Sequence, residues 1–174
     1  MLKLAPQGNF VEMKVTGLTI DPFTSMPIII LKDLQEKRAL PIWIGLIEAS
    51  SIATELEKIK LTRPMTHDLM KQMLEHLGAH VAYVAITQLA DNTFYSSVVL
   101  HSEKGEILLD ARPSDAVALS LRTKTSIYVA EEVIAKSRQI DAELHSPDKD
   151  KARKEKWAEI LENLSPEDFG KYKM

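Results

Sequence analysis

Three charged side chains lie close together where one apolar stretch ends and another begins, in residues 109–119. Asp110, Arg112 and Asp115 fall within six residues of one another. Pro113 favours the first turn of a helix, because its missing N–H would have no helical partner there, and it pushes Arg112 towards an extended backbone. We therefore expect a strand to end and a buried helix to begin here, with Asp115 at its rim. Because an unpaired buried carboxylate costs several kcal/mol, the pattern predicts an arginine or a metal ion beside Asp115.

A second stretch repeats this order of residue types. Arg63 and Pro64 precede Thr66, His67 and Asp68 at another expected helix start. Taken alone, each stretch is also typical of an ordinary helix entry, in which a hydroxyl caps the first turn and the helix dipole stabilises the aspartate. The repetition favours a shared site over two separate caps.

Glu48 occupies the corresponding place in a third unit. It lies in the first turn of an expected helix, directly after the strand-like residues 40–44 and Gly45. A lone glutamate in this position is also typical of simple compensation of the helix dipole. Because all three helix starts follow strands that should join one sheet, we expect Glu48, Asp68 and Asp115 to converge on a common cleft.

The periodicity of apolar residues predicts an α+β domain. Alternating or continuous apolar runs predict two antiparallel meanders, and spacings of three and four residues predict helices between and after them. Met70 and Met73 are expected to fill gaps in the core, whereas His76, His80 and His101 show no metal-ligand spacing and are expected at the surface or at strand edges. The predicted strands are 10–20, 27–31, 38–44, 79–89, 94–101, 106–109 and 126–129, and the predicted helices are 48–56, 69–77, 113–124 and 130–136.

Composition limits the kind of protein. With 174 residues, of which 45% are hydrophobic, the chain can form one domain, expected at residues 1–136, plus a helical C-terminal extension at 137–174. Trp157, Ile160, Leu161 and Leu164 form one apolar stripe in that extension, which we expect to dock on its own domain or on a neighbouring subunit.

Charge and residue usage exclude several functions. A net charge of −3 and a pI of about 6.0 give no global attraction to nucleic acid, so a polyanion would have to bind through a few local contacts. Without cysteine the chain has no disulfide, no thiolate nucleophile and no cysteine-ligated zinc. No apolar run is long enough to cross a bilayer, so we expect no membrane partner and a cytoplasmic location.

Three motifs in order carry a family likeness: residues 40–49, with Ile42, Trp43 and Glu48; residues 63–69; and residues 111–116. Together they resemble the bifunctional nuclease family, over roughly residues 13–133. The resemblance implies an α+β domain with a large mixed, mostly antiparallel sheet and packed helices, assembly into homo-oligomers, and cleavage of both RNA and DNA.

Phosphodiester hydrolysis without cysteine or a histidine dyad most readily uses carboxylates that hold one or two divalent metals, together with arginines that bind phosphate. We expect the metal to be Mg²⁺ or Mn²⁺. We therefore predict a weak, low-specificity, metal-dependent nuclease. The predicted roles are catalysis and metal binding for Glu48, Asp68 and Asp115, general base catalysis or additional metal ligation for His67, and substrate binding for Arg63, Arg112 and Ser114, the last of which is also a helix cap.

An alternative from another class fits the same residues. Arg63, Asp68, Arg112 and Asp115 would form a buried ion-pair network in a non-catalytic oligomeric regulatory or scaffold module. The acidic pI and the absence of interleaved aromatic and basic residues favour this alternative.

Overall fold

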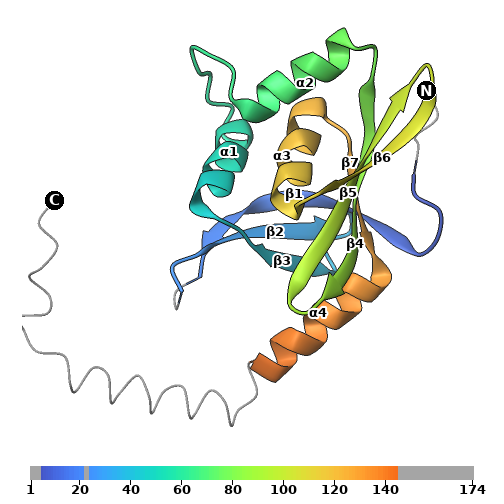
Figure 1. The fold of residues 1–174 in the computed structure, drawn as a ribbon. Helices are drawn as coiled ribbons and strands as arrows, with labels where there is room; N and C mark the ends of the chain where they lie inside the picture. Colours follow the sequence, from blue (N-terminus) through green and yellow to red (C-terminus); the bar gives the residue numbers. More distant parts are fainter. Residues whose placement is uncertain (1–4, 22–23, 145–174) are drawn as a thin grey trace, which may run out of the picture. The chain divides into compact units, whose positions relative to one another are not determined.

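The computed structural model describes residues 5–21 and 24–144, which form seven strands and four helices (Figure 1). The predicted α+β class is confirmed, and every predicted strand and helix within these ranges is present. The strands are β1 (Phe10–Ile20), β2 (Pro27–Asp33), β3 (Ala39–Trp43), β4 (His80–Ala90), β5 (Thr93–Ser102), β6 (Gly105–Ala111) and β7 (Ser126–Ala130), and the helices are α1 (Leu46–Leu56), α2 (Thr66–His76), α3 (Pro113–Thr123) and α4 (Glu131–Leu144).

All seven strands belong to one mostly antiparallel sheet, in the order β3-β2-β1-β7-β4-β5-β6. The two predicted meanders, β1 to β3 and β4 to β6, are confirmed. The last strand, β7, joins them: it runs antiparallel to β1 and parallel to β4. The chain must therefore return from the edge strand β6 to the middle of the sheet, and α3 makes that connection.

The helix α3 is packed on nearly all sides, as its apolar sequence predicts. It contacts α1, α2 and strands β4, β5 and β7. Ala116, Val117, Ala118 and Leu119 are each at most 3% exposed. Small residues on α3 let the neighbouring helices approach closely, so the helix starts at Leu46, Thr66 and Pro113 belong to one packed group.

The helix α2 differs from its prediction. Its apolar stripe was expected to enter the core, yet Leu69, Met70, Met73 and Leu77 are between 41% and 76% exposed, and His67 is its buried residue. The expectation that Met70 and Met73 fill the core is wrong. Helical spacing shows that a helix has an apolar face, but it does not show whether another element of the same chain covers that face.

The edge strand β6 carries further exposed apolar side chains. Ile107, Leu108 and Leu109 are 44%, 71% and 44% exposed, and β6 pairs with β5 along one side. His76 and His80 are exposed, as predicted, whereas His101 is half-buried on β5, opposite His80 and between β4 and β6, and is neither at the surface nor on an edge strand.

The helix α4 extends to Leu144, eight residues beyond its predicted end. Residues 137–144 are polar but contain neither glycine nor proline, so a change in composition there does not stop the helix. One compact unit of the chain ends at Ser137 and a second begins at Arg138. The predicted stripe from Trp157 to Leu164 lies outside the described residues. Among the helices in the described ranges, none is long and apolar enough to span a membrane.

Burial within α1 yields a matched pair of predictions. Ile52 is fully buried, whereas Ile47, one and a half turns earlier, is 82% exposed. We expect Ile52→Ala to lower the free energy of unfolding by about 2–5 kcal/mol, and Ile47→Ala to change it by less than about 0.5 kcal/mol. Urea denaturation of both variants measures the difference. Equal effects would contradict the placement of α1 on the sheet.

Candidate active site

Local sequence fixes the three helix starts that border the site. Arg112 is the N-cap of α3 and has an extended backbone, and Pro113 lies in the first turn. The predicted change from strand to helix at these two residues is therefore confirmed. Gly45 is the N-cap of α1. At the start of α2, the Met65 backbone N–H donates to the Asp68 carboxylate over 2.8 Å, which satisfies one of the unpaired donors of the first turn.

Arg112 joins two of the predicted carboxylates. Its Nε donates to Asp115 Oδ2 over 2.8 Å, and its Nη1 donates to Glu48 Oε1 over 2.9 Å. The cation predicted beside Asp115 is therefore an arginine three residues earlier in the chain. The Arg112 side chain is 65% exposed, and a guanidinium has five N–H donors. Its Nη2 makes a third, longer contact of 3.4 Å with Asp115 Oδ1, so three of the five N–H groups have partners and the remaining two can bind an anion.

His67 lies on the other side of the same aspartate. Its Nε2 is 3.2 Å from Asp115 Oδ1, and its Nδ1 is 3.0 Å from the Ser51 hydroxyl. An ionised carboxylate only accepts hydrogen bonds, so a neutral His67 carries its proton on Nε2 and accepts the Ser51 O–H at Nδ1. The result is a carboxylate, an imidazole and a hydroxyl in a row.

The charge on Asp115 is stabilised by these neighbours. Burial raises the pKa of its carboxyl, but hydrogen bonds from Arg112 and His67, together with the charge of Arg112, lower it more, and the pKa lies below its ordinary value. Hydrogen bonds to Asp115 and Glu48 raise the pKa of Arg112. At neutral pH the site therefore holds an ionised aspartate beside a permanent cation.

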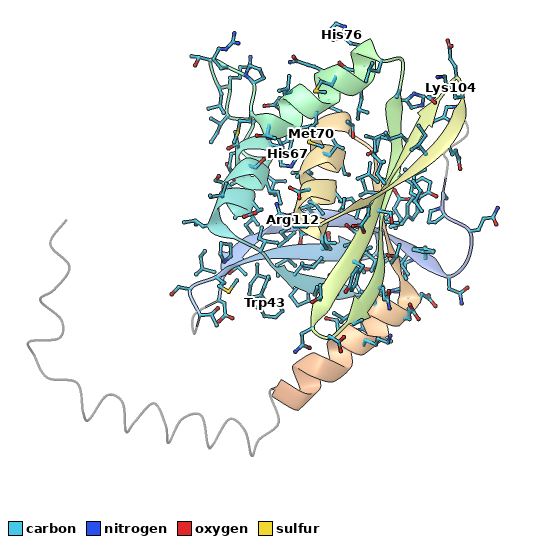
Figure 2. All side chains as sticks on the ribbon, viewed as in Figure 1. Trp43, His67, Met70, His76, Lys104 and Arg112 are labelled. Carbon is cyan, nitrogen blue, oxygen red and sulfur yellow. The ribbon has the colours of Figure 1, made fainter. Side chains whose placement is uncertain are left out.

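These groups line one cavity of about 460 Å³, which we call the site cavity. Figure 2 shows His67 and Met70 of α2 and Arg112 at the start of α3 on the same side of the molecule. The site cavity is lined by Ile47, Glu48, Ser51, Met65, Thr66, His67, Met70, Asp110, Ala111, Arg112 and Asp115. Ser114 is buried and lines a neighbouring cavity, together with Glu48 and Arg112.

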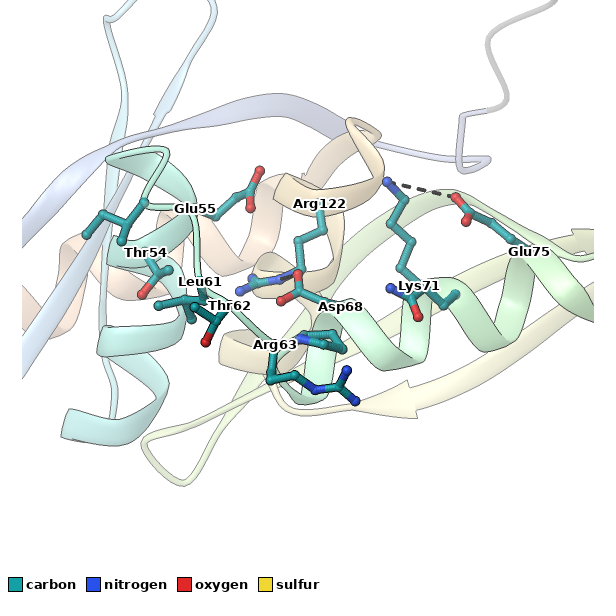
Figure 3. Close-up of a pocket in the computed structure, with 12 residues that line it drawn as sticks. Thr54, Glu55, Leu61, Thr62, Arg63, Asp68, Lys71, Glu75 and Arg122 are labelled. Carbon is teal, nitrogen blue, oxygen red and sulfur yellow. Dashed lines mark hydrogen bonds and ion pairs between the residues drawn. The ribbon is translucent and has the colours of Figure 1, made fainter.

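Asp68 and Arg63 lie elsewhere. Both line a second cavity of about 500 Å³ (Figure 3). There Asp68 accepts a hydrogen bond of 2.6 Å from Nε of Arg122. Burial raises the pKa of Asp68, but the Met65 N–H and Arg122 outweigh it and hold the pKa below its ordinary value. Glu48 and Asp115 therefore line one cavity and Asp68 lines another, so the three carboxylates expected in a single cleft are not all together.

The separation of Asp68 from Glu48 and Asp115 affects the predicted metal site. Glu48 and Asp115 are near each other, but the Arg112 guanidinium bridges them, and Asp68 is held by Arg122 in the other cavity. Among the side chains described, those of residues 5–21 and 24–138, no three His, Asp or Glu are grouped so as to hold a metal ion. The predicted ligand set does not fit a metal in this arrangement, because a cation would have to replace Arg112. Metal dependence stays a prediction.

Two residues at the site were missed in the sequence. Ser51 stands among other hydroxyl residues of α1, and nothing in its spacing marks it. Arg122 did carry a signal, since it is the one charged residue in the last turns of an otherwise apolar helix. Its side chain is 3% exposed and donates to Asp68, to the Ala118 carbonyl and to the Ser51 carbonyl. Arg122 therefore ties α1, α2 and α3 together.

Comparison with known proteins places the chain among the bifunctional nuclease domains. Residues 29–142 match the bifunctional nuclease domain. An uncharacterized protein of Mycobacterium tuberculosis is 35% identical over 162 residues, which cover 91% of this chain and 97% of that protein. Bifunctional nuclease 1 of Oryza sativa subsp. japonica is 32% identical over 93 residues, 52% of this chain and 28% of the plant protein. Bifunctional nuclease 1 of Arabidopsis thaliana is 27% identical over 119 residues, 65% and 36% of the two chains.

The two arginines of the site should differ sharply in their effect on stability. Arg122→Met removes a buried cation and its three hydrogen bonds, to Asp68 and to the Ala118 and Ser51 carbonyls, and we expect a loss of about 2–5 kcal/mol in the free energy of unfolding. Arg112→Met, at an exposed ion pair, should cost about 1 kcal/mol or less. Chemical denaturation of both variants provides the test. A mild effect of Arg122→Met would contradict its role as the tie between the helices.

Proposed function

Since the chain belongs to the bifunctional nuclease domain family, we propose that it is a nuclease that hydrolyses phosphodiester bonds in RNA and DNA. The proposal is supported by the names of the plant relatives and, above all, by one observation in the site cavity. Arg112 is exposed and has N–H groups free for a ligand, and it donates to Asp115, the same ionised aspartate that orients His67. Phosphate binding and proton transfer are thus available within a single cavity.

In the proposed reaction Arg112 binds the non-bridging oxygens of the scissile phosphate. Its charge offsets the negative charge that grows in the transition state, and its planar fork fits a phosphate better than an ammonium group does. His67 transfers protons. Asp115 holds its Nε2–H and stabilises the imidazolium that forms when Nδ1 accepts a proton. Glu48 keeps Arg112 directed across the cavity.

The proposed activity is weak and shows little sequence preference. In the part of the chain that the structure describes, the site cavity offers a few phosphate contacts and is lined by one arginine, and the full chain carries a net charge of −3. Binding should therefore fall with rising salt in proportion to the few phosphates that are neutralised. Arg63 and Ser114 remain proposed substrate contacts at the neighbouring cavities, and a cytoplasmic location remains part of the proposal.

The alternative is the non-catalytic oligomeric module. One observation favours it: each of Glu48, Asp68 and Asp115 already has an arginine partner, as a structural network requires. The buried part of that network is Asp68 with Arg122, and Arg63 is not among the partners of Asp68. A structural network would account for the buried His67–Ser51 contact, but it does not use the exposed N–H groups of Arg112. Together with the names of the plant relatives, these exposed donors are why we prefer the nuclease.

We also propose that the protein is a homo-oligomer. Exposed apolar side chains lie on α2 and on the edge strand β6, two elements that also contribute residues to the site cavity. Apolar patches of several hundred Å² on a protein surface commonly mark contact sites. The edge of β6 contains neither proline nor lysine to prevent pairing with another strand.

Cleavage assays on single-stranded RNA and DNA test the nuclease. We expect Asp115→Asn and His67→Gln to abolish cleavage, because each removes the proton-transfer pair. Arg112→Lys should reduce cleavage about tenfold to a hundredfold, since it keeps the charge but loses hydrogen bonds to a charged group worth about 1.5–3 kcal/mol. The exposed Glu103→Gln is the control and should match the wild type.

Each assay is run with Mg²⁺, with Mn²⁺ and with a chelator, and each variant is melted in parallel. Wild-type protein that cleaves neither substrate under any of these conditions would contradict the proposal. An Asp115→Asn protein that melts several degrees lower, from an inactive parent that no metal stabilises, would favour the structural network.

The oligomer makes a separate prediction. We expect the chain to sediment above its monomer mass of 19.6 kDa at micromolar concentration. Leu108→Glu should shift it towards the monomer, because it puts a charge into the proposed contact. Leu34→Glu is the control, since Leu34 is also exposed, at 59%, but lies in the turn after β2. A wild-type chain with the monomer mass would remove the proposal.

A further inference from the structure

We propose that Ser51 is the nucleophile of the site and that cleavage passes through a covalent phosphoserine. This inference rests on the proposed phosphodiester chemistry and names the group that attacks phosphorus. It starts from the row formed by Asp115 Oδ1, the His67 ring and Ser51 Oγ, with contacts of 3.2 Å and 3.0 Å. A hydroxyl bound to an imidazole that a carboxylate orients is the arrangement that activates serine nucleophiles in unrelated folds.

Comparison with its neighbours on α1 singles out Ser51. Ser50 donates its hydroxyl to the Ile47 carbonyl over 2.8 Å, and Thr54 donates to the Ser50 carbonyl over 2.7 Å. Both hydroxyls satisfy their own helix, as is usual for such residues. The Ser51 hydroxyl instead points to the His67 ring. Its backbone carbonyl accepts from Arg122 over 3.1 Å, which fixes the position of Ser51 from behind.

The surroundings of Ser51 suit a nucleophile. Ser51 is 5% exposed and lines the site cavity together with His67 and Arg112. Its low exposure limits competition from bulk water for the imidazole. Arg112 is on the same cavity wall as Asp115, where its free N–H groups can bind the non-bridging oxygens of a phosphate. The cavity thus brings together a hydroxyl, a base and an anion-binding group.

The reaction balances with these groups and water alone. Ser51 Oγ forms a bond to phosphorus while its proton moves to His67 Nδ1. The bond from phosphorus to the ester oxygen of the leaving nucleotide breaks, and that oxygen takes the proton from His67. Water then attacks the phosphoserine, giving one proton to His67, and the bond between phosphorus and Ser51 Oγ breaks. His67 returns the proton to Oγ.

A serine nucleophile has a consequence for substrate range. Because the attacking hydroxyl belongs to the protein, cleavage does not need the 2′-hydroxyl of RNA. The same site can therefore act on RNA and DNA, which is the range proposed above. Ser51 supplies a single mechanism for both substrates.

The test is covalent labelling of the purified full chain with a small alkyl fluorophosphonate, followed by peptide mapping. We expect one label per chain, on Ser51, formed on the order of a hundredfold faster than on Ser50, which is the size of effect that a positioned general base gives. His67→Gln should lose the label, whereas Ser50→Ala should keep it. Labelling that spares Ser51, or that is equally fast in the two serines, would overturn the proposal.

Cleavage assays on the same preparations separate this proposal from the nuclease itself. Ser51→Ala should lose cleavage of both RNA and DNA, while Ser50→Ala should keep it. Cleavage that persists in Ser51→Ala would overturn the nucleophile and leave the nuclease standing. Label on Ser51 in a protein that cleaves neither polymer would instead overturn the nuclease and leave a reactive serine. Melting of each variant shows whether it is folded.

Discussion

The site depends on the ionised carboxylate of Asp115. It lies in the first turn of α3, where the helix dipole favours a negative charge, and it accepts hydrogen bonds from Arg112 and His67. Each of its two neighbours has a further partner: Arg112 reaches Glu48, and His67 reaches Ser51. Neutralising this one group would leave Glu48 as the remaining charged partner of Arg112 and would remove the acceptor that sets the His67 tautomer. Binding of phosphate and transfer of protons are thus coupled through one side chain.

A second interaction places α1 and α2 against that carboxylate. Arg122 lies two turns further along α3 and donates to the Ser51 carbonyl and to Asp68, so it fixes residues adjacent to His67 and the backbone of Ser51 itself. A buried charge must be paired, and this requirement sets the mutual position of the three helices. The two networks differ in exposure. The Arg122 side chain is 3% exposed, and that of Arg112 is 65% exposed. The buried Arg122 network is suited to holding the helices together, and the exposed Arg112 network is suited to binding a ligand.

Local patterns predicted most of the fold. Alternation of apolar residues gave both meanders, and the Arg112–Pro113 pair marked the end of β6 and the start of α3. The position of β7 between the meanders was beyond local patterns, because the order of strands in a sheet depends on contacts distant in sequence. The exposure of Met70 and Met73 was missed for the same reason. An apolar stripe indicates a face, and tertiary structure decides whether it is covered.

The candidate site was predictable in part. Helix starts gave Glu48, His67, Arg112 and Asp115, which the structure brings together around the site cavity. Asp68 was assigned to the same cleft, but its carboxylate turns to Arg122, a partner 54 residues away. Ser51 has the same residue type as its neighbour Ser50, and only the packing of α2 on α1 and α3 distinguishes them. The partners of Asp68 and Ser51 therefore could not be predicted from the sequence, because they depend on how the helices pack against one another.

The position of the proton on the His67 ring is the most direct test of the contacts from Asp115 through His67 to Ser51. Nitrogen NMR of ¹⁵N-histidine-labelled protein, with His67→Gln used to assign its signals among the five histidines, reports which ring nitrogen carries the proton. From these contacts we predict that neutral His67 is protonated on Nε2, facing Asp115, and that its Nδ1 accepts a hydrogen bond from Ser51. Asp115→Asn should disturb this preference, and Glu103→Gln should not. A neutral His67 protonated on Nδ1 would contradict the role of His67 as the base for Ser51, because that nitrogen could then neither activate Ser51 nor accept its proton.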